Sequence, residues 1–147
     1  MGTNWLNDDE QQTWRAFIAM THTVMESLDR QLQHDAGIPH GYYVILVQLS
    51  EAPERSIRMS ELAHILDWSQ SRVSHAVDRL VGDGLVRRER CPTDRRGSFA
   101  ILTDEGFDAL QRAAPGHVQQ VRHIVFDKLT PVEQRQLQKI ASKVANA

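Results

Sequence analysis

A run of short polar side chains at residues 69–75, interrupted by one arginine and ending in one histidine, carries the groups best suited to hydrogen-bond with nucleobases. Glutamine pairs with adenine, arginine with guanine, and serine with either base. If Ser69 caps a helix, the backbone N–H groups that follow it are also presented to a phosphate. Because a solvated helix face has a similar composition, this run on its own leaves both interpretations open.

Five arginines lie within the ten residues 87–96, in a segment that has the composition of a β-hairpin. The connection over residues 91–97 is rich in turn-forming residues, so Arg95 and Arg96 are expected at a protruding tip. Arginines at such a tip suit a narrow minor groove, where the negative potential is strongest. Asp94 is placed to pair with a neighbouring arginine and to orient it. The hairpin therefore favours DNA binding over a merely solvated surface.

The charge distribution supports a localised nucleic-acid footprint. The net charge of −2 argues against indiscriminate binding to nucleic acid. Residues 69–98, however, contain seven arginines against four acids, whereas the rest of the chain has ten basic and fifteen acidic residues. A basic segment inside an acidic chain is typical of a protein that contacts DNA through one defined surface.

Two short helices and a hairpin must position these residues. A helix capped by Ser60 is followed by a turn at Asp67-Trp68, and Ser69 caps a second helix that runs to about Val81. The strands at 85–90 and 98–102 then pair as a hairpin. Two helices joined by a tight turn and followed by a hairpin predict a winged helix-turn-helix.

The flanking segments predict further helices. An apolar stripe runs along residues 8–35, residues 40–50 are nearly all apolar, and another stripe follows Thr103. Pro115-Gly116 is expected to kink or split that later helix, and Thr130 to Glu133 forms a capping box for the last one. The predicted fold is mainly α with a small β-hairpin wing: a winged helix-turn-helix over 39–102, flanked by dimerisation helices over 8–36 and 103–147 within a single domain. The surplus apolar stripes require a second copy or, alternatively, fold back into one monomeric bundle.

Several other classes are disfavoured. The longest apolar run has six residues, far below the roughly 18 of a membrane span, and the N-terminus lacks a secretory pattern, so a cytoplasmic protein is expected. The only cysteine rules out an intramolecular disulfide. Phosphate-loop, nucleophile-elbow and His-Glu-x-x-His motifs are absent from the sequence, so it predicts no enzyme. The histidine spacing suggests no metal, and no cofactor is expected.

Six short motifs in this order resemble the MarR (multiple antibiotic resistance regulator) family from about residue 10 to the C-terminus. They are Arg58-Met-Ser-Glu-Leu-Ala63, Ser69-Gln-Ser-Arg-Val-Ser-His75, Val77-Asp-Arg-Leu80, Gly84-Leu-Val-Arg87, Asp94-Arg-Arg96 and Leu102-Thr-Asp-Glu-Gly106. The chain departs from the usual pattern at Asp67-Trp68, where a small or glycine-containing turn is more common.

The resemblance implies a homodimer on a pseudo-palindromic DNA operator, with the helix near 69–81 in the major groove and the 85–102 wing in the minor groove. It also implies that Asp78 and Arg79 brace the wing or touch phosphate. A repressor is favoured over an activator, because a dimer over an operator blocks polymerase without an activating surface. The residues expected at the DNA are Ser69, Gln70, Ser71, Arg72, Ser74, His75, Arg79, Asp94, Arg95 and Arg96.

The resemblance further implies release from DNA by a small aromatic or phenolic effector. The candidate lining residues, which could equally be plain core or dimer contacts, are Trp14, Arg15, Phe17, His40, Tyr42 and Tyr43. Two alternative functions stay open. One is a winged-helix module for protein–protein interaction, and the other is a redox-responsive regulator that senses through Cys91, whose pKa a nearby arginine could lower.

Overall fold

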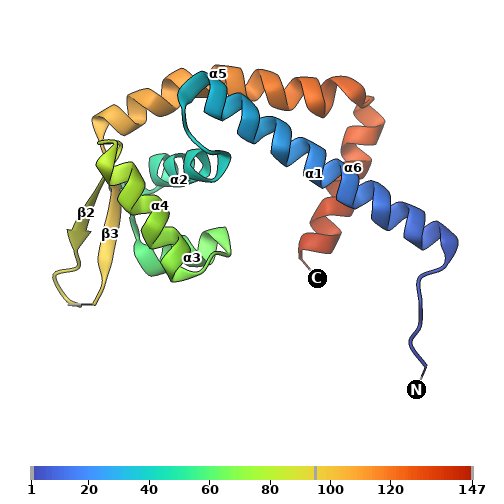
Figure 1. The fold of residues 1–147 in the computed structure, drawn as a ribbon, viewed down its shortest axis with the longest axis horizontal. Helices are drawn as coiled ribbons and strands as arrows, with labels where there is room; N and C mark the ends of the chain where they lie inside the picture. The colour runs from blue at the N-terminus through green and yellow to red at the C-terminus, as the bar shows by residue number, and fades with distance from the viewer. Residues whose placement is uncertain (1, 95, 147) are drawn as a thin grey trace.

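The computed structural model describes residues 2–94 and 96–146, which form a mainly helical chain with one small antiparallel sheet (Figure 1). This confirms the predicted fold class. In chain order the elements are α1 (Asp8–Ala36), α2 (His40–Glu51), the 3-10 turn η1 (Pro53–Arg55), β1 (Ser56–Arg58), α3 (Met59–Leu66), α4 (Gln70–Gly82), β2 (Val86–Arg90), β3 (Ser98–Leu102), α5 (Asp104–Ile124), the 3-10 turn η2 (Phe126–Lys128) and α6 (Pro131–Ala145).

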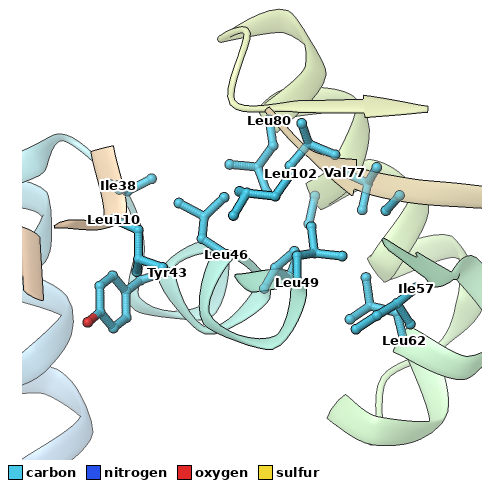
Figure 2. Close-up of a cluster of buried hydrophobic side chains, with 14 of the residues drawn as sticks. Ile38, Tyr43, Leu46, Leu49, Ile57, Leu62, Val77, Leu80, Leu102 and Leu110 are labelled. Atoms are coloured by element: carbon cyan, nitrogen blue, oxygen red, sulfur yellow. The ribbon is translucent and has the colours of Figure 1, made fainter. Parts of the chain in front are cut away.

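The winged part comprises α2, α3, α4 and the sheet, and it is built around one apolar core (Figure 2). Leu46 and Leu49 of α2, Leu62 of α3 and Leu80 of α4 are all fully buried. Leu110 joins this core from α5. The core therefore fixes the direction of α4 relative to the sheet and to the first half of α5.

The sheet forms the wing and has the strand order β1-β3-β2, with both pairs antiparallel. Ile57 of β1 faces Ala100 of β3, and Val86 of β2 faces Leu102 of β3. These four residues are buried, whereas the other four residues of β2 are exposed. The wing thus rests on the core through one end and extends into solvent with its arginine-rich strand outermost.

A tight junction joins the end of α4, the start of β2 and the start of α5. Gly84 has φ of +75°, a conformation that glycine adopts without steric cost. The Thr103 hydroxyl donates to the Gly84 carbonyl at 2.7 Å, and the Thr103 N–H donates to the Leu85 carbonyl at 3.1 Å. A Cβ on Gly106 would lie 2.0 Å from the Leu85 oxygen. Only glycine at position 106 therefore allows α5 to begin against the base of the wing.

Two details of the predicted helices are wrong. Ser60 does not cap the first helix of the pair: α3 begins at Met59, and its N-cap Arg58 makes no side-chain cap bond. Pairing of Arg58 with Phe99 keeps the chain extended up to that residue, so the helix starts immediately afterwards. Of the predicted kink or split at Pro115-Gly116, the split is wrong, because α5 runs unbroken from 104 to 124. Close packing of Gly116 against Gln31 of α1 supports this stretch.

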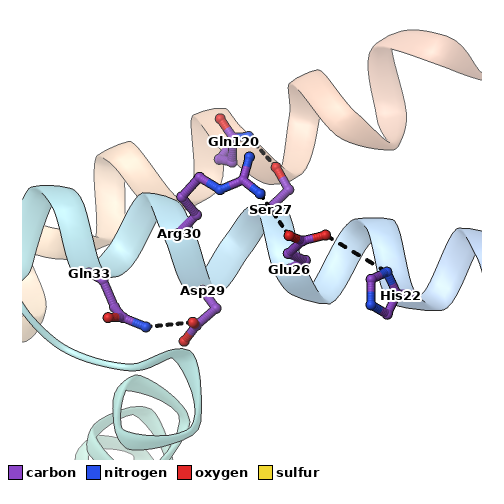
Figure 3. A network of polar contacts seen from close by, with 7 residues as sticks. All are labelled: His22, Glu26, Ser27, Asp29, Arg30, Gln33 and Gln120. Atoms are coloured by element: carbon purple, nitrogen blue, oxygen red, sulfur yellow. Dashed lines mark hydrogen bonds and ion pairs between the residues drawn. The ribbon is translucent and has the colours of Figure 1, made fainter.

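The long helices α1 and α5 lie side by side, and the chain bends after α5 into α6 (Figure 1). Gln120 of α5 donates to Ser27 of α1 at 2.7 Å, next to the Arg30–Glu26 pair at 2.8 Å (Figure 3). Asn7 and Gly37 delimit α1 as a capping-box residue and a left-handed C-cap. None of the described helices is both long and apolar enough to cross a membrane.

Apolar side chains remain exposed on these long helices and on α6. Trp14 of α1 is 54% exposed, Ile140 of α6 is 61% exposed and Val144 is 67% exposed. In addition, α6 contributes no buried residue in the single chain. The predicted amphipathic stripes exist, and in one copy of the chain they are largely uncovered.

Candidate nucleic-acid interface

The first turn of α4 presents the predicted polar run to solvent. The Ser69 hydroxyl caps the helix by accepting from the Arg72 N–H at 3.2 Å, as expected from the sequence. The inner face of the helix is buried through Val73, Ala76, Val77 and Leu80, also as predicted. The exposed residues of the predicted set on and before α4 are Ser69, Gln70, Ser71, Arg72, His75 and Arg79.

Ser74 points to the wing. The Arg88 guanidinium of β2 donates to the Ser74 hydroxyl at 3.2 Å, to the Asp78 carboxylate at 2.7 Å and to the Ser98 hydroxyl at 3.1 Å. Arg88 thus bridges α4, β2 and β3. These bonds agree with the expectation that Asp78 braces the wing, and they place Ser74 in the same brace.

Asp94 orients the tip of the wing through a partner that the sequence did not suggest. One of its oxygens accepts from the Arg58 guanidinium of β1 at 3.2 Å, and the other accepts from the Arg96 N–H at 3.0 Å. A Cβ on Gly97 would lie 2.9 Å from the Arg58 guanidinium, so glycine leaves room for this bridge. Arg58 and Asp94 are 36 positions apart, and only the pairing of β1 with β3 brings them together.

A polar groove separates α4 from the wing. It encloses about 480 Å³, and its lining includes three guanidinium groups, several hydroxyls and a single carboxylate. The charged side chains of the lining are Arg58, Arg88, Arg96 and Asp94. Of the predicted wing-tip pair, Arg96 borders this groove, while Arg95 lies outside the described residues. The groove has the positive charge and the hydrogen-bond donors that a phosphate backbone requires.

Cys91 lies at the base of the wing tip, where it is buried. Its sulfur is 3.3 Å from the Thr93 hydroxyl and 3.4 Å from the Arg58 guanidinium. Hydrogen bonds from Thr93, with a smaller contribution from the charge of Arg58, lower the pKa of the Cys91 thiol. The redox-responsive alternative stays a prediction.

The Asp67-Trp68 turn brings the indole into contact with α4. The Arg72 guanidinium lies over the Trp68 ring, 3.8 Å from its centroid. Both residues border a hollow of about 570 Å³ between the start of α2 and α4, together with Tyr42 and His75. The sequence indicated both Arg72 and the unusual turn, but it did not predict the contact between Arg72 and Trp68.

The six predicted effector residues fall in two separate places within one chain. Trp14, Arg15 and Phe17 lie on the first half of α1, with the Trp14 and Phe17 rings stacked at 6.0 Å. The other three lie at the start of α2, where the His40 N–H donates to Asp29 of α1 at 2.9 Å. Asp29 is roughly 20 Å along α1 from the first group at 1.5 Å per residue. The structure does not bring the two groups together in a single copy.

The second group is itself divided. Tyr42 borders the hollow beside Trp68, whereas Tyr43 is buried and packs on His117 of α5 with centroids 4.5 Å apart. His40 stacks on His117 at 5.7 Å. Burial lowers the pKa of both histidines, and the neighbouring His40 lowers that of His117 further. Within residues 2–94 and 96–146, no three metal-binding side chains form a cluster.

Comparisons with known proteins agree with this architecture. The sequence profile of the MarR family matches residues 36–97. Sco3205, a MarR family transcriptional regulator from Streptomyces coelicolor that was crystallised with DNA, is 54% identical. That match covers 97% of this chain and 90% of Sco3205, with a TM-score of 0.93.

Two further relatives are informative. AbsC, a MarR family regulator from the same organism, is 40% identical over 98% of this chain and 97% of its own, with a TM-score of 0.91. The transcriptional repressor YetL of Bacillus subtilis is 28% identical over 60% of this chain and 53% of its own length. The present chain therefore matches about half of YetL and nearly all of the two Streptomyces proteins.

Proposed function

Because the chain belongs to the MarR family of transcriptional regulators, we propose that it binds a pseudo-palindromic DNA operator as a homodimer and represses transcription there. The observation that carries this proposal is the polar groove between α4 and the wing, which is bordered by the exposed polar run of α4 and by Arg96 of the wing tip. Its relatives are regulators of transcription, so the chain is a regulator and not an enzyme. Sco3205, the relative of 54% identity, was crystallised with DNA.

In this proposal α4 lies in the major groove and the wing reaches the minor groove. Arg72, Arg79 and Arg96 are available for DNA, because the ion pairs found within residues 2–94 and 96–146 include none of them. Arg58 and Arg88 instead hold the wing in place. The first three arginines would supply positive charge to the DNA-binding surface, and the paired arginines would keep that surface rigid.

The homodimer is supported by the uncovered apolar side chains of the end helices. Phe17, Val118 and Ile140 are each about half exposed or more in one chain. Exposed apolar patches of this kind mark protein–protein contacts in soluble proteins. A two-fold dimer built through α1, α5 and α6 would place two α4 helices about one DNA turn, roughly 34 Å, apart. Repression then follows from occupancy of the operator.

Selection of fragments from random duplex DNA tests the proposal. We expect an inverted repeat with half-site centres about 10 base pairs apart, and an affinity that falls steeply as salt increases. Arg96→Ala should lower the salt slope by about one unit for each phosphate interaction that the substitution removes. Arg30→Ala, which removes an exposed arginine of α1, should leave the slope unchanged. Enrichment of no sequence by the folded protein would overturn the proposal, and a protein partner would then become the favoured target of the winged helix.

Release by a small aromatic effector remains part of the hypothesis. Since the six candidate residues lie in two places, a single site that contains all of them would have to form between two copies. Trp14 and Phe17 of one copy would then need to lie near the α2 start of the other. Once the operator is known, release of the labelled operator by benzoate, with benzamide as the uncharged control, tests this part separately.

A further inference from the structure

The turn between α3 and α4 is built to hold a large aromatic ring in a fixed place. Asp67 has φ of +51°, a left-handed conformation that is uncommon for a residue other than glycine. The Trp68 N–H donates to the Ala63 carbonyl at 3.0 Å, which closes the turn onto α3. The Trp68 side chain packs against the apolar core. The indole is thus anchored by its own backbone and by the core beneath it.

One part of the indole occupies space that is free only because residue 41 is glycine. A Cβ on Gly41 would lie 2.8 Å from Cη2 and 3.0 Å from Cζ2 of Trp68. Gly41 is near the start of α2 and has no positive φ, so its backbone conformation does not require glycine. The close approach of the indole explains the glycine instead.

The ring of the same indole supports the Arg72 guanidinium. The central guanidinium carbon lies 3.8 Å from the ring centroid, a distance that suits face-to-face stacking, and an arginine stacked in this way keeps its N–H edges free for hydrogen bonds. A long arginine side chain loses conformational freedom when it binds, and a side chain that is already held in place loses less. The contact therefore prepares Arg72 for recognition at the exposed N-terminal turn of α4.

We propose that Trp68 is a positioning residue that holds Arg72 in the conformation in which it contacts a base edge. The inference rests on the proposed binding of DNA, and it assigns a role to the turn by which this chain departs from the usual pattern of its family. In this arrangement contacts run from Gly41 of α2 through Trp68 to Arg72 of α4. We term this series of contacts the relay.

The first test needs no DNA. Ring currents from a stacked indole shift the Arg72 side-chain protons upfield in the NMR spectrum of the free protein. Trp68→Leu should return these signals to ordinary values, whereas Trp5→Leu, which removes an exposed tryptophan ahead of α1, should not. Arg72 signals that do not move in Trp68→Leu would overturn the proposal.

The second test measures base discrimination with the operator obtained by selection. Each operator base pair is changed in turn, and the pair at which Arg72→Ala loses discrimination identifies the Arg72 contact. Trp68→Leu should weaken operator binding by about 2- to 5-fold, the scale of an exposed cation–π contact, and reduce discrimination at that same pair. Trp68→Phe should retain most of both, because a phenyl ring also stacks.

The double variant separates positioning from a general structural effect. In the Arg72→Ala background Trp68→Leu should cost nothing further, because the residue it positions is already gone. An equal loss in both backgrounds would show that Trp68 only supports the fold, and would overturn the inference. If the wild type enriches no DNA, the proposed function fails, while the NMR test still decides whether Trp68 holds Arg72.

Gly41→Ala provides a third test, which disturbs the Trp68 side chain from α2. Alanine forms helix better than glycine, so a free position 41 would gain stability from the change. Displacement of the indole should instead lower the melting temperature and move the Arg72 signals in the direction seen for Trp68→Leu. A gain in stability with unchanged Arg72 signals would contradict the relay.

Discussion

The winged part and the end helices α1, α5 and α6 differ in how far their apolar side chains are buried. In the winged part Leu46, Leu62 and Leu80 are fully buried, and they come from three different helices that close around one core. On α6, by contrast, Ile140 and Val144 are about two-thirds exposed, and the helix buries no residue. The first region completes its core within one chain, whereas the second leaves its apolar surface for another surface to cover.

This difference teaches that the two regions should respond differently to the same kind of mutation. A change in the winged core should be felt by every copy of the chain at any concentration. A change on the exposed stripes should be felt only when two copies meet. Each prediction below tests that separation.

The largest effect is expected from Leu80→Ala in α4. Loss of a fully buried leucine costs about 2–5 kcal/mol of unfolding free energy, because the removed atoms leave a cavity. Urea unfolding followed by far-UV circular dichroism measures this cost, which should not depend on protein concentration. The matched change Ile140→Ala should cost little at high dilution. A similar loss of unfolding free energy in Leu80→Ala and Ile140→Ala at high dilution would contradict the proposed difference between the winged part and the end helices.

Ile140→Glu should come next, and it should act on assembly. A carboxylate placed in an apolar interface is unfavourable unless it is paired, so the proposed dimer should dissociate into folded monomers. Sedimentation equilibrium detects this change. Gln138→Glu adds the same charge about 200° away around α6 and should leave the dimer intact. A monomeric wild type would instead support the alternative in which the stripes serve a single chain.

Asp78→Asn tests the brace between α4 and the wing, with an expected cost of no more than about 1 kcal/mol. The Asp78 side chain is 61% exposed and the Arg88 side chain 34% exposed, and pairs in contact with solvent contribute little to global stability. The local effect should be clearer: amide exchange should accelerate over 86–90 and 98–102, with α6 unchanged. Equal acceleration in α6 would mean that the wing and the end helices do not move independently.

The smallest effect concerns pH and arises where the two regions meet. Burial lowers the pKa of His40 and His117, although the charge of Asp29 opposes this for His40. Unfolding restores pKa values near 6.5, so the unfolded chain binds more protons in the range below about pH 6.5. Stability from these histidines is therefore complete above that pH and is lost as pH falls through the lowered folded-state values.

Paired unfolding curves at pH 7.5 and pH 5.5 measure this effect. His117→Gln should flatten the difference between them, while His22→Gln, which alters an exposed histidine of α1, should preserve it. Two identical pH responses for wild type and His117→Gln would show that the half-buried pair of His40 and His117 does not control this dependence.

Local patterns were enough to predict most of the fold. The cap at Ser69, the buried face of α4, the left-handed Gly84 and the capping box at Thr130 all depend on residues within a few positions of one another. The predicted winged helix, with both hairpin strands and the long first helix, follows from such patterns. The start of α3 differs because it depends on the pairing of Arg58 with β3, and the unbroken α5 depends on packing against α1.

The site was less accessible to sequence reasoning, because its ion pairs join side chains on different helices and strands. Arg88 reaches Asp78 across the boundary of helix and sheet, and Arg58 reaches Asp94 across 36 positions. Composition indicated that the arginines matter, but it could not distinguish those that face solvent from those that hold the wing. Of the effector residues, buried Tyr43 shows how an aromatic candidate can belong to the core.

The close contact between Gly106 and the Leu85 carbonyl has a mechanical consequence. Because α5 starts in direct contact with the Leu85 carbonyl, we expect the base of the wing and the start of the helix to move as one unit. The 21 residues of α5 form a lever about 30 Å long at 1.5 Å per residue. A tilt of about 10° at its far end would therefore carry the wing root through about 5 Å, roughly the rise of one helical turn. In the proposed dimer, we therefore expect small adjustments at the far end of α5 to change the separation of the two α4 helices.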